Sequence, residues 1–85
     1  MVTFDYTIKD ELGIHVRPAG QLAQLCKSKL SKSTIEIDGK EAEISKLFAV
    51  MALAVKCGDT ITVKVDGADE EQTSEEIKKF LEENL

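Results

Sequence analysis

The stretch Gly13-Ile14-His15-Val16-Arg17-Pro18-Ala19-Gly20 marks the point where the hydrophobic pattern of the chain changes. Before it, apolar and polar residues alternate with a period of two, which predicts a strand with one buried face. From Val16 onwards the apolar residues recur at helical spacing. Pro18 suits the first turn of a helix, where its missing N–H is no loss. The apolar positions are Val2, Phe4, Tyr6 and Ile8 in the strand, and Ala19, Leu22, Ala23, Cys26 and Leu30 in the helix.

His15, the only histidine, therefore lies just outside a helix N-terminus. The first backbone N–H groups of a helix, here those of Val16 and Arg17, have no partner within the helix and favour an anion. A neutral imidazole is a nucleophile, and an anion bound to it would face these donors and the Arg17 guanidinium. The simplest chemistry for such a site is a phosphoryl group carried on His15.

The middle of the chain contains a strong hairpin signal. Thr34 to Ile37 and Lys40 to Ile44 flank the dipeptide Asp38-Gly39. Two residues of this kind between alternating strands favour a type I′ turn, which needs positive φ at both positions. A two-residue loop pairs Ile37 with Lys40 and Ile35 with Ala42.

A second helix is expected from Lys46 to about Val55, with Ser45 as its cap. It is apolar nearly all round, which is hard to bury in a chain of 85 residues. We expect one side to face the core and the other to be partly exposed, as a contact surface. The core side is Val50, Leu53 and Ala54, and the outer side is Leu47, Phe48 and Met51. Gly58 is expected to end this region as a left-handed C-cap.

The last part of the chain predicts a strand over Thr60 to Asp66 and a final helix. Asp69, with Gln72 three residues later, is typical of a capping box. The inward stripe of this helix would be Thr73, Ile77, Phe80, Leu81 and Asn84. The order is therefore β-α-β-β-α-β-α in a single domain spanning residues 1–85. We predict an α+β fold, in which three helices cover one face of a four-stranded antiparallel sheet.

Composition excludes several classes of function. A net charge of −5 argues against nucleic acid as the main partner. The longest apolar run, Leu47 to Val55, is far shorter than the roughly 20 residues needed to cross a membrane, and no signal peptide is evident. We therefore expect a cytoplasmic protein that does not insert into membranes. Cys26 and Cys57 are expected to be reduced and mostly buried, and neither a metal nor a cofactor is predicted.

The heptad Gly13-Ile14-His15-Val16-Arg17-Pro18-Ala19 resembles the active-site motif of HPr, the histidine-containing phosphocarrier of the bacterial sugar phosphotransferase system. The element order and the length match as well, so the resemblance covers essentially the whole chain. It implies an open-faced β-sandwich and a relay function. His15 would accept a phosphoryl group at Nδ1 from enzyme I and pass it to the A domain of a sugar permease component. Arg17 would help to hold the group.

The resemblance also implies a docking surface around the histidine. Its positions here are Gly20, Gln24, Lys27, Leu47, Phe48 and Met51, to which we add Leu12 and Lys46 at the rim. Encounters with partners should be small and transient, and we expect the protein to be a monomer.

Several residues depart from the family pattern. Where many relatives have a regulatory serine that a kinase phosphorylates, this chain has Lys46, which carries the opposite charge. Ser45 is adjacent but is a weak candidate for that modification. The family usually has a small or polar residue at the position of Leu12. It usually has alanine or threonine at the positions of Val16 and Gly20. Within a helix, Gly20 costs about 1 kcal/mol relative to alanine. Close approach by a partner, or packing against the sheet, would explain it equally well.

Two other functions compete with the carrier. One is an HPr paralogue that acts mainly as a regulatory protein-binding module; such paralogues tend to lack the histidine, which His15 argues against. The other is an enzyme that uses His15 as a general base, but one histidine and one arginine on a small open domain supply no pocket.

Overall fold

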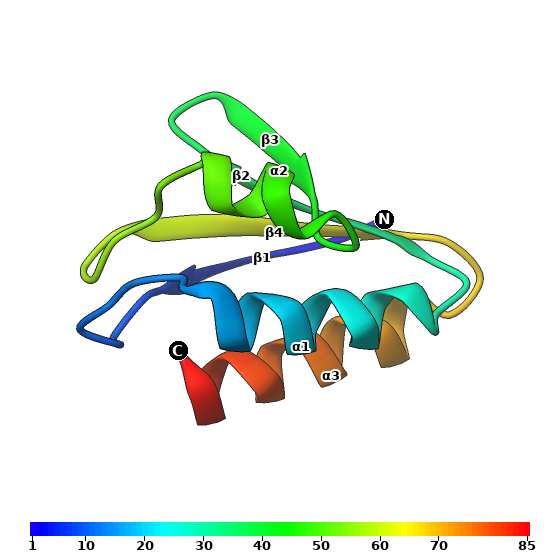
Figure 1. Ribbon diagram of the computed structural model, residues 1–85. Coiled ribbons are helices and arrows are strands. Elements are labelled where there is room, and N and C mark those ends of the chain that lie inside the picture. Colours follow the sequence, from blue (N-terminus) through cyan, green and yellow to red (C-terminus); the bar gives the residue numbers. More distant parts are fainter.

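The computed structural model describes all 85 residues and contains four strands and three helices in the predicted order (Figure 1). The strands are β1 (Val2–Thr7), β2 (Lys32–Ile37), β3 (Lys40–Glu43) and β4 (Thr60–Asp66), and the helices are α1 (Val16–Lys27), α2 (Leu47–Ala52) and α3 (Glu70–Asn84). The predicted element order and the bounds of the last strand are thus confirmed.

The strands form one antiparallel sheet in the order β1-β4-β2-β3. The β2–β3 hairpin turns at Asp38 and Gly39, whose φ angles are 50° and 79°. This is the type I′ geometry that the dipeptide predicts. The predicted register is also confirmed, because Ile37 pairs with Lys40 and Ile35 with Ala42.

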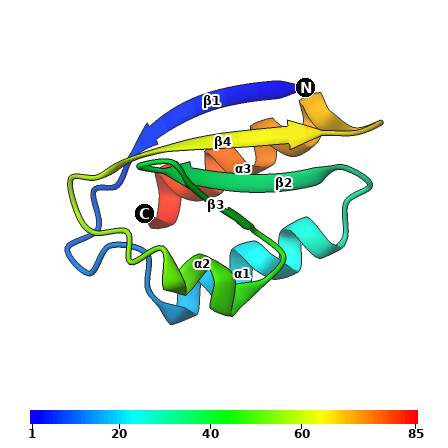
Figure 2. The same ribbon diagram turned by 90° about the horizontal axis from the view of Figure 1, so that it is seen from above.

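The helices lie on one side of the sheet. In Figure 1 α1 and α3 run side by side beneath it, and α3 packs against β1 and β4. The short helix α2 lies next to β3 and packs against α1, as the view in Figure 2 shows. Between sheet and helices lies the hydrophobic core, in which burial of one large aliphatic side chain contributes about 1.5–3 kcal/mol. Its least exposed members are Ile8, Leu22, Ile35, Ile44, Ile61, Val63, Val65, Ile77 and Leu81.

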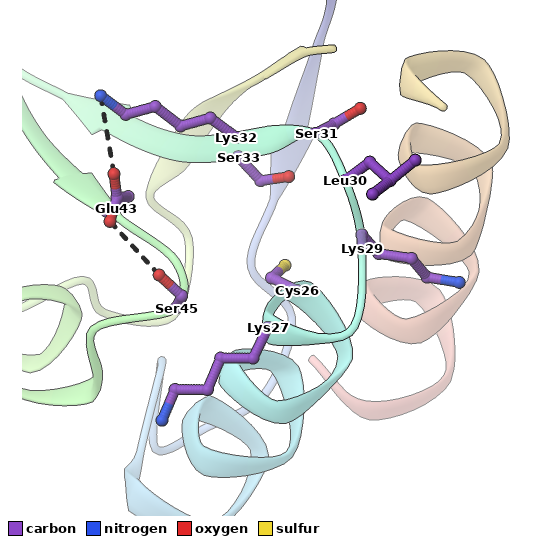
Figure 3. Close-up of a pocket in the computed structure, with 9 residues that line it drawn as sticks. All are labelled: Cys26, Lys27, Lys29, Leu30, Ser31, Lys32, Ser33, Glu43 and Ser45. Carbon is purple, nitrogen blue, oxygen red and sulfur yellow. Dashed lines mark hydrogen bonds and ion pairs between the residues drawn. The ribbon is translucent and has the colours of Figure 1, made fainter. Parts of the chain in front are cut away.

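The second helix differs from its prediction at the start. It begins only at Leu47, and Lys46 occupies the N-cap position without a side-chain capping bond. The Ser45 hydroxyl instead donates to Glu43 Oε2 over 3.3 Å, as the dashed line in Figure 3 shows. Ser45 as the cap was therefore wrong, because a tight turn after β3 directs its hydroxyl back to Glu43.

The end of α2 is also earlier than predicted. The helix stops at Ala52, and Ala54 adopts the left-handed conformation with φ of 53°. Ala54 is therefore exposed rather than facing the core. Gly58 lies in a later turn, where its N–H donates to the Ile8 carbonyl over 2.8 Å. The C-cap residue of α2 is Leu53, and the left-handed residue directly after it is Ala54, so the assignment to Gly58 was wrong.

At the start of α3 the predicted capping box does not form. Asp69 is the N-cap residue, but its carboxylate accepts hydrogen bonds from the backbone N–H groups of Leu30 and Ser31 and from the Ser31 hydroxyl. The bond from Ser31 is the main reason why the pKa of Asp69 is held at about 2. Asp69 thus ties the loop after α1 to the start of α3.

Three further predictions need correction. Leu30 is 81% exposed, because α1 ends at Lys27 before the helical stripe reaches it. Asn84 is exposed, and Leu85 is buried in its place. Of the two free cysteines only Cys26 is buried, and this burial raises its pKa to about 11.

Candidate functional site

His15 occupies the N-cap position of α1, as predicted. Its backbone is extended, with φ of −114° and ψ of 173°, while its carbonyl accepts the Ala19 N–H over 3.0 Å. This carbonyl is the acceptor of the first turn of the helix. The imidazole, 34% exposed, stands at the helix entrance within reach of solvent.

The loop before His15 is held against the chain that follows α2. Gly13 has φ of +69°, and a Cβ atom there would lie 2.3 Å from the Val55 carbonyl oxygen. The next residue, Ile14, is buried, and its N–H donates to the same carbonyl over 3.1 Å. Only glycine fits this contact. The position of His15 is therefore fixed by a segment about forty residues away in the sequence.

Asp10 is a site residue that the sequence reasoning missed. Its Oδ1 accepts the Leu12 N–H over 2.8 Å, and its backbone carbonyl accepts the Gly13 N–H over 2.9 Å. Its other oxygen, Oδ2, lies 3.5 Å from Nε2 of His15. An aspartate bonding to the backbone two residues on is a common turn, and this pattern in the loop could have drawn attention to Asp10.

The donors predicted for an anion are free. The N–H groups of Val16 and Arg17 make no hydrogen bond in this chain, and the proline at position 18 has no N–H to offer. The Arg17 side chain is exposed and forms no ion pair. An anion on His15 would therefore find two backbone donors and one guanidinium without displacing another contact.

The residues predicted for docking come from the loop before α1, from α1 itself and from α2, which packs on α1. Two of them stand out as apolar side chains in solvent, since Leu12 is 72% and Phe48 85% exposed. Val16, which was predicted only as a backbone donor, is 62% exposed as well. Leu47 and Met51 are half-buried and pack against the core. Gln24, Lys27 and Lys46 are exposed.

Gly20 has an open environment. A Cβ atom at this position would meet nothing within 4 Å. Two explanations were predicted for this glycine, close approach by a partner and packing against the sheet. The second is therefore wrong.

The hollows of the surface lie away from the histidine. The one in Figure 3 is formed by the end of α1 and the strands β2 and β3, with the Cys26 and Ser33 side chains facing each other at its base. Lys27 reaches its rim, but neither His15 nor Arg17 lines this hollow or any of the other three. The histidine is thus presented on an open surface, which suits contact with a macromolecule better than enclosure of a small substrate.

Two other kinds of site are not seen. No group of three or more His, Cys, Asp or Glu side chains is arranged to hold a metal ion. None of the helices combines the length and the apolar character that a membrane span requires.

Known proteins resemble this chain over nearly its full length. A family model described as "PTS HPr component phosphorylation site" matches residues 2–83. The phosphocarrier protein HPr of Mycoplasma genitalium is 41% identical over 85 residues, which cover 99% of this chain and 97% of that protein.

Solved structures agree with this likeness. The histidine-containing phosphocarrier protein of a Mycoplasma has a TM-score of 0.93 at 34% identity, covering 96% of this chain and 93% of that one. Crh of Bacillus subtilis, a catabolite-repression protein solved as a domain-swapped dimer, has a TM-score of 0.79 at 27% identity and covers 100% and 98%. The fold, the motif and the extent of these matches together show that the chain belongs to the HPr family, the phosphocarriers of the phosphotransferase system.

Proposed function

We propose that this protein relays a phosphoryl group, which His15 receives from phospho-enzyme I and passes to the A domains of sugar permease components. The observation that carries the proposal is the pairing of an accessible imidazole with two free backbone donors at the start of α1. Such a site stabilises the group enough for it to form and leaves it open to the next acceptor.

The chemistry needs little from the carrier itself. The lone pair of Nδ1 attacks phosphorus while the bond from phosphorus to the donor nitrogen breaks, and the donor keeps that electron pair. Catalysis of such a transfer rests on in-line positioning and on stabilisation of the phosphoryl oxygens. Here the N–H groups of Val16 and Arg17 and the Arg17 guanidinium supply that stabilisation. The protein is a carrier and has no small-molecule substrate of its own.

Partners would bind at what we call the docking surface: Leu12, Gly20, Gln24, Lys27, Lys46, Leu47, Phe48 and Met51. Its members come from the loop before α1, from α1 itself and from α2, which packs on α1. A surface of this size fits brief encounters. We propose that these take place in the cytoplasm with a monomeric carrier.

We also propose that no serine switch acts at this surface. Lys46 stands at the start of α2, and its Nζ lies 3.9 Å from Glu43 Oε2. The hydroxyl of Ser45 is bonded to the same carboxylate, so a phosphate there would face a negative charge. Incubation with a serine-directed HPr kinase and ATP, followed by intact-mass measurement, should leave the protein unmodified. Stoichiometric phosphate on Ser45 would contradict this.

The proposed relay is tested with phosphoenolpyruvate, Mg²⁺ and enzyme I. We expect one phosphate per chain, labile in acid and stable in base, and none on the His15→Ala variant. An HPr paralogue that acts mainly as a regulatory protein-binding module would instead take little phosphate, and phosphate that persists on His15→Ala would end the proposal.

A further inference from the structure

We infer that Asp10 is a positioning residue for His15, which holds the imidazole proton on Nε2 and so leaves the Nδ1 lone pair free to attack. This rests on the proposed relay and adds a residue to it that neither the motif nor the docking surface contains.

The geometry gives each oxygen of the Asp10 carboxylate its own contact. Oδ1 accepts the Leu12 N–H over 2.8 Å, which fixes the side chain in its loop. Oδ2 then lies 3.5 Å from His15 Nε2. The two side chains are 29% and 34% exposed, so both are partly shielded from water.

The chemistry of the two groups decides which imidazole nitrogen carries the proton. An ionised carboxylate only accepts hydrogen bonds, and a neutral imidazole has one N–H and one lone pair. Because Nε2 faces Oδ2, the tautomer with its proton on Nε2 is favoured. The lone pair of the imidazole then lies on Nδ1. A carboxylate that orients a histidine in this way is known to control which nitrogen reacts.

The same contact assists during transfer. As the Nδ1–phosphorus bond forms and the donor's nitrogen–phosphorus bond breaks, the His15 ring gains positive charge. The Nε2 proton stays on the ring, and its charge faces Asp10 Oδ2. No proton has to leave, so the step balances without a further base.

The substitution Asp10→Asn tests this contact sharply. Asparagine keeps an oxygen for the Leu12 N–H, so the loop is retained, but it then turns an NH₂ group towards His15. That donor requires a lone pair on Nε2, which moves the proton to Nδ1 and blocks the nucleophile. In the serine-protease triad an equivalent substitution lowers turnover by about 10⁴-fold. Because this site is open to water, which competes for the imidazole, we expect a loss of about 10- to 100-fold in the rate of phosphoryl transfer.

Glu11→Gln is the matched control. Glu11 is the adjacent exposed carboxylate and forms neither an ion pair nor a side-chain hydrogen bond, and its substitution changes the net charge equally. Two measurements are made on the full chain. Rapid-quench kinetics with phospho-enzyme I give the transfer rate, and ¹⁵N shifts of labelled His15 at a pH where the ring is neutral identify its tautomer.

The inference is supported if Asp10→Asn slows transfer and raises the Nδ1–H tautomer while Glu11→Gln does neither. A slower rate with an unchanged tautomer overturns it, since Asp10 would then act by charge alone, and so does an unchanged rate. Should Asp10→Asn fail to fold, the unsubstituted protein decides, because a majority of the Nδ1–H tautomer there also overturns the inference. If the unsubstituted protein takes no phosphate, the proposed relay is wrong. The tautomer of His15 is measured without phosphate, so this failure can be told apart from failure of the inference about Asp10.

Discussion

Phe48 offers the clearest separation of docking from folding. Its ring is 85% exposed on α2, so it contributes little to the core. Truncation by Phe48→Ala should therefore change the free energy of unfolding by less than about 0.5 kcal/mol, as is usual for surface substitutions. Leu47, its neighbour, is a poorer probe, because it packs against the core and its loss would weaken the fold as well.

The expected loss of docking follows from the area that the ring exposes. Burying one such side chain in an interface contributes about 1.5–3 kcal/mol. That range corresponds to a Kd for enzyme I that is weaker by roughly 10- to 150-fold. A docking surface with few large apolar groups should depend strongly on this one.

The assay compares Phe48→Ala with Leu30→Ala. Leu30 is 81% exposed in the loop between α1 and β2, outside the docking surface. Both variants lose a large exposed apolar side chain, so they differ mainly in location. Titration calorimetry with enzyme I gives Kd, and urea denaturation gives stability. Equal Kd values for the two variants would refute the docking surface on α2.

Three further predictions concern two glycines near the histidine and the carboxylate at the start of α3. Gly20→Ala should raise the free energy of unfolding by about 1 kcal/mol, because a Cβ there meets nothing and alanine favours the helix; unchanged or lower stability in urea would contradict this. Gly13→Ala should cost more than about 2 kcal/mol, since it combines positive φ with a Cβ placed 2.3 Å from the Val55 carbonyl, and thermal unfolding near the unsubstituted midpoint would show that the loop adjusts freely. Asp69 has a pKa of about 2 in the fold against 3.8 for a free carboxyl, so the stability that its ionised form contributes is present above pH 3.8 and lost as the pH falls towards 2. Asp69→Asn should therefore flatten the pH dependence of unfolding in that window, and an unchanged slope would count against the bonds from Ser31.

Local patterns predicted most of the fold, and they failed where another group competed for a capping side chain. The hairpin at Asp38 and Gly39 needs only its own backbone geometry, so its register could be predicted residue by residue. Asp69 has the spacing of a capping box, but its carboxylate is taken by a loop some forty residues earlier. Ser45 failed as a cap for a local reason, because its hydroxyl donates to Glu43, two residues earlier in the chain. A propensity describes what a residue does when nothing else competes for it.

The candidate site, too, could be predicted only in part. The helix start at His15 and the free donors of Val16 and Arg17 follow from sequence spacing, because a helix N-terminus is a local structure. The contact of Asp10 with His15 could not be predicted, since it depends on how the loop between them is folded. That loop is shaped by Gly13, whose close approach to Val55 involves a segment beyond α2.

The contact between the loop before His15 and the segment after α2 couples the position of the histidine to that of α2. The left-handed residue Ala54 turns the chain sharply after α2, and the next residue, Val55, presents its carbonyl to the Ile14 N–H. A left-handed conformation costs a residue with a side chain about 1–2 kcal/mol relative to right-handed helix. Strain of this kind persists only where the surrounding structure determines it. Here the contact with Val55 fixes the loop before His15 to the chain that follows α2. Under the proposed relay, a partner docked on α2 would therefore meet an imidazole already positioned for transfer.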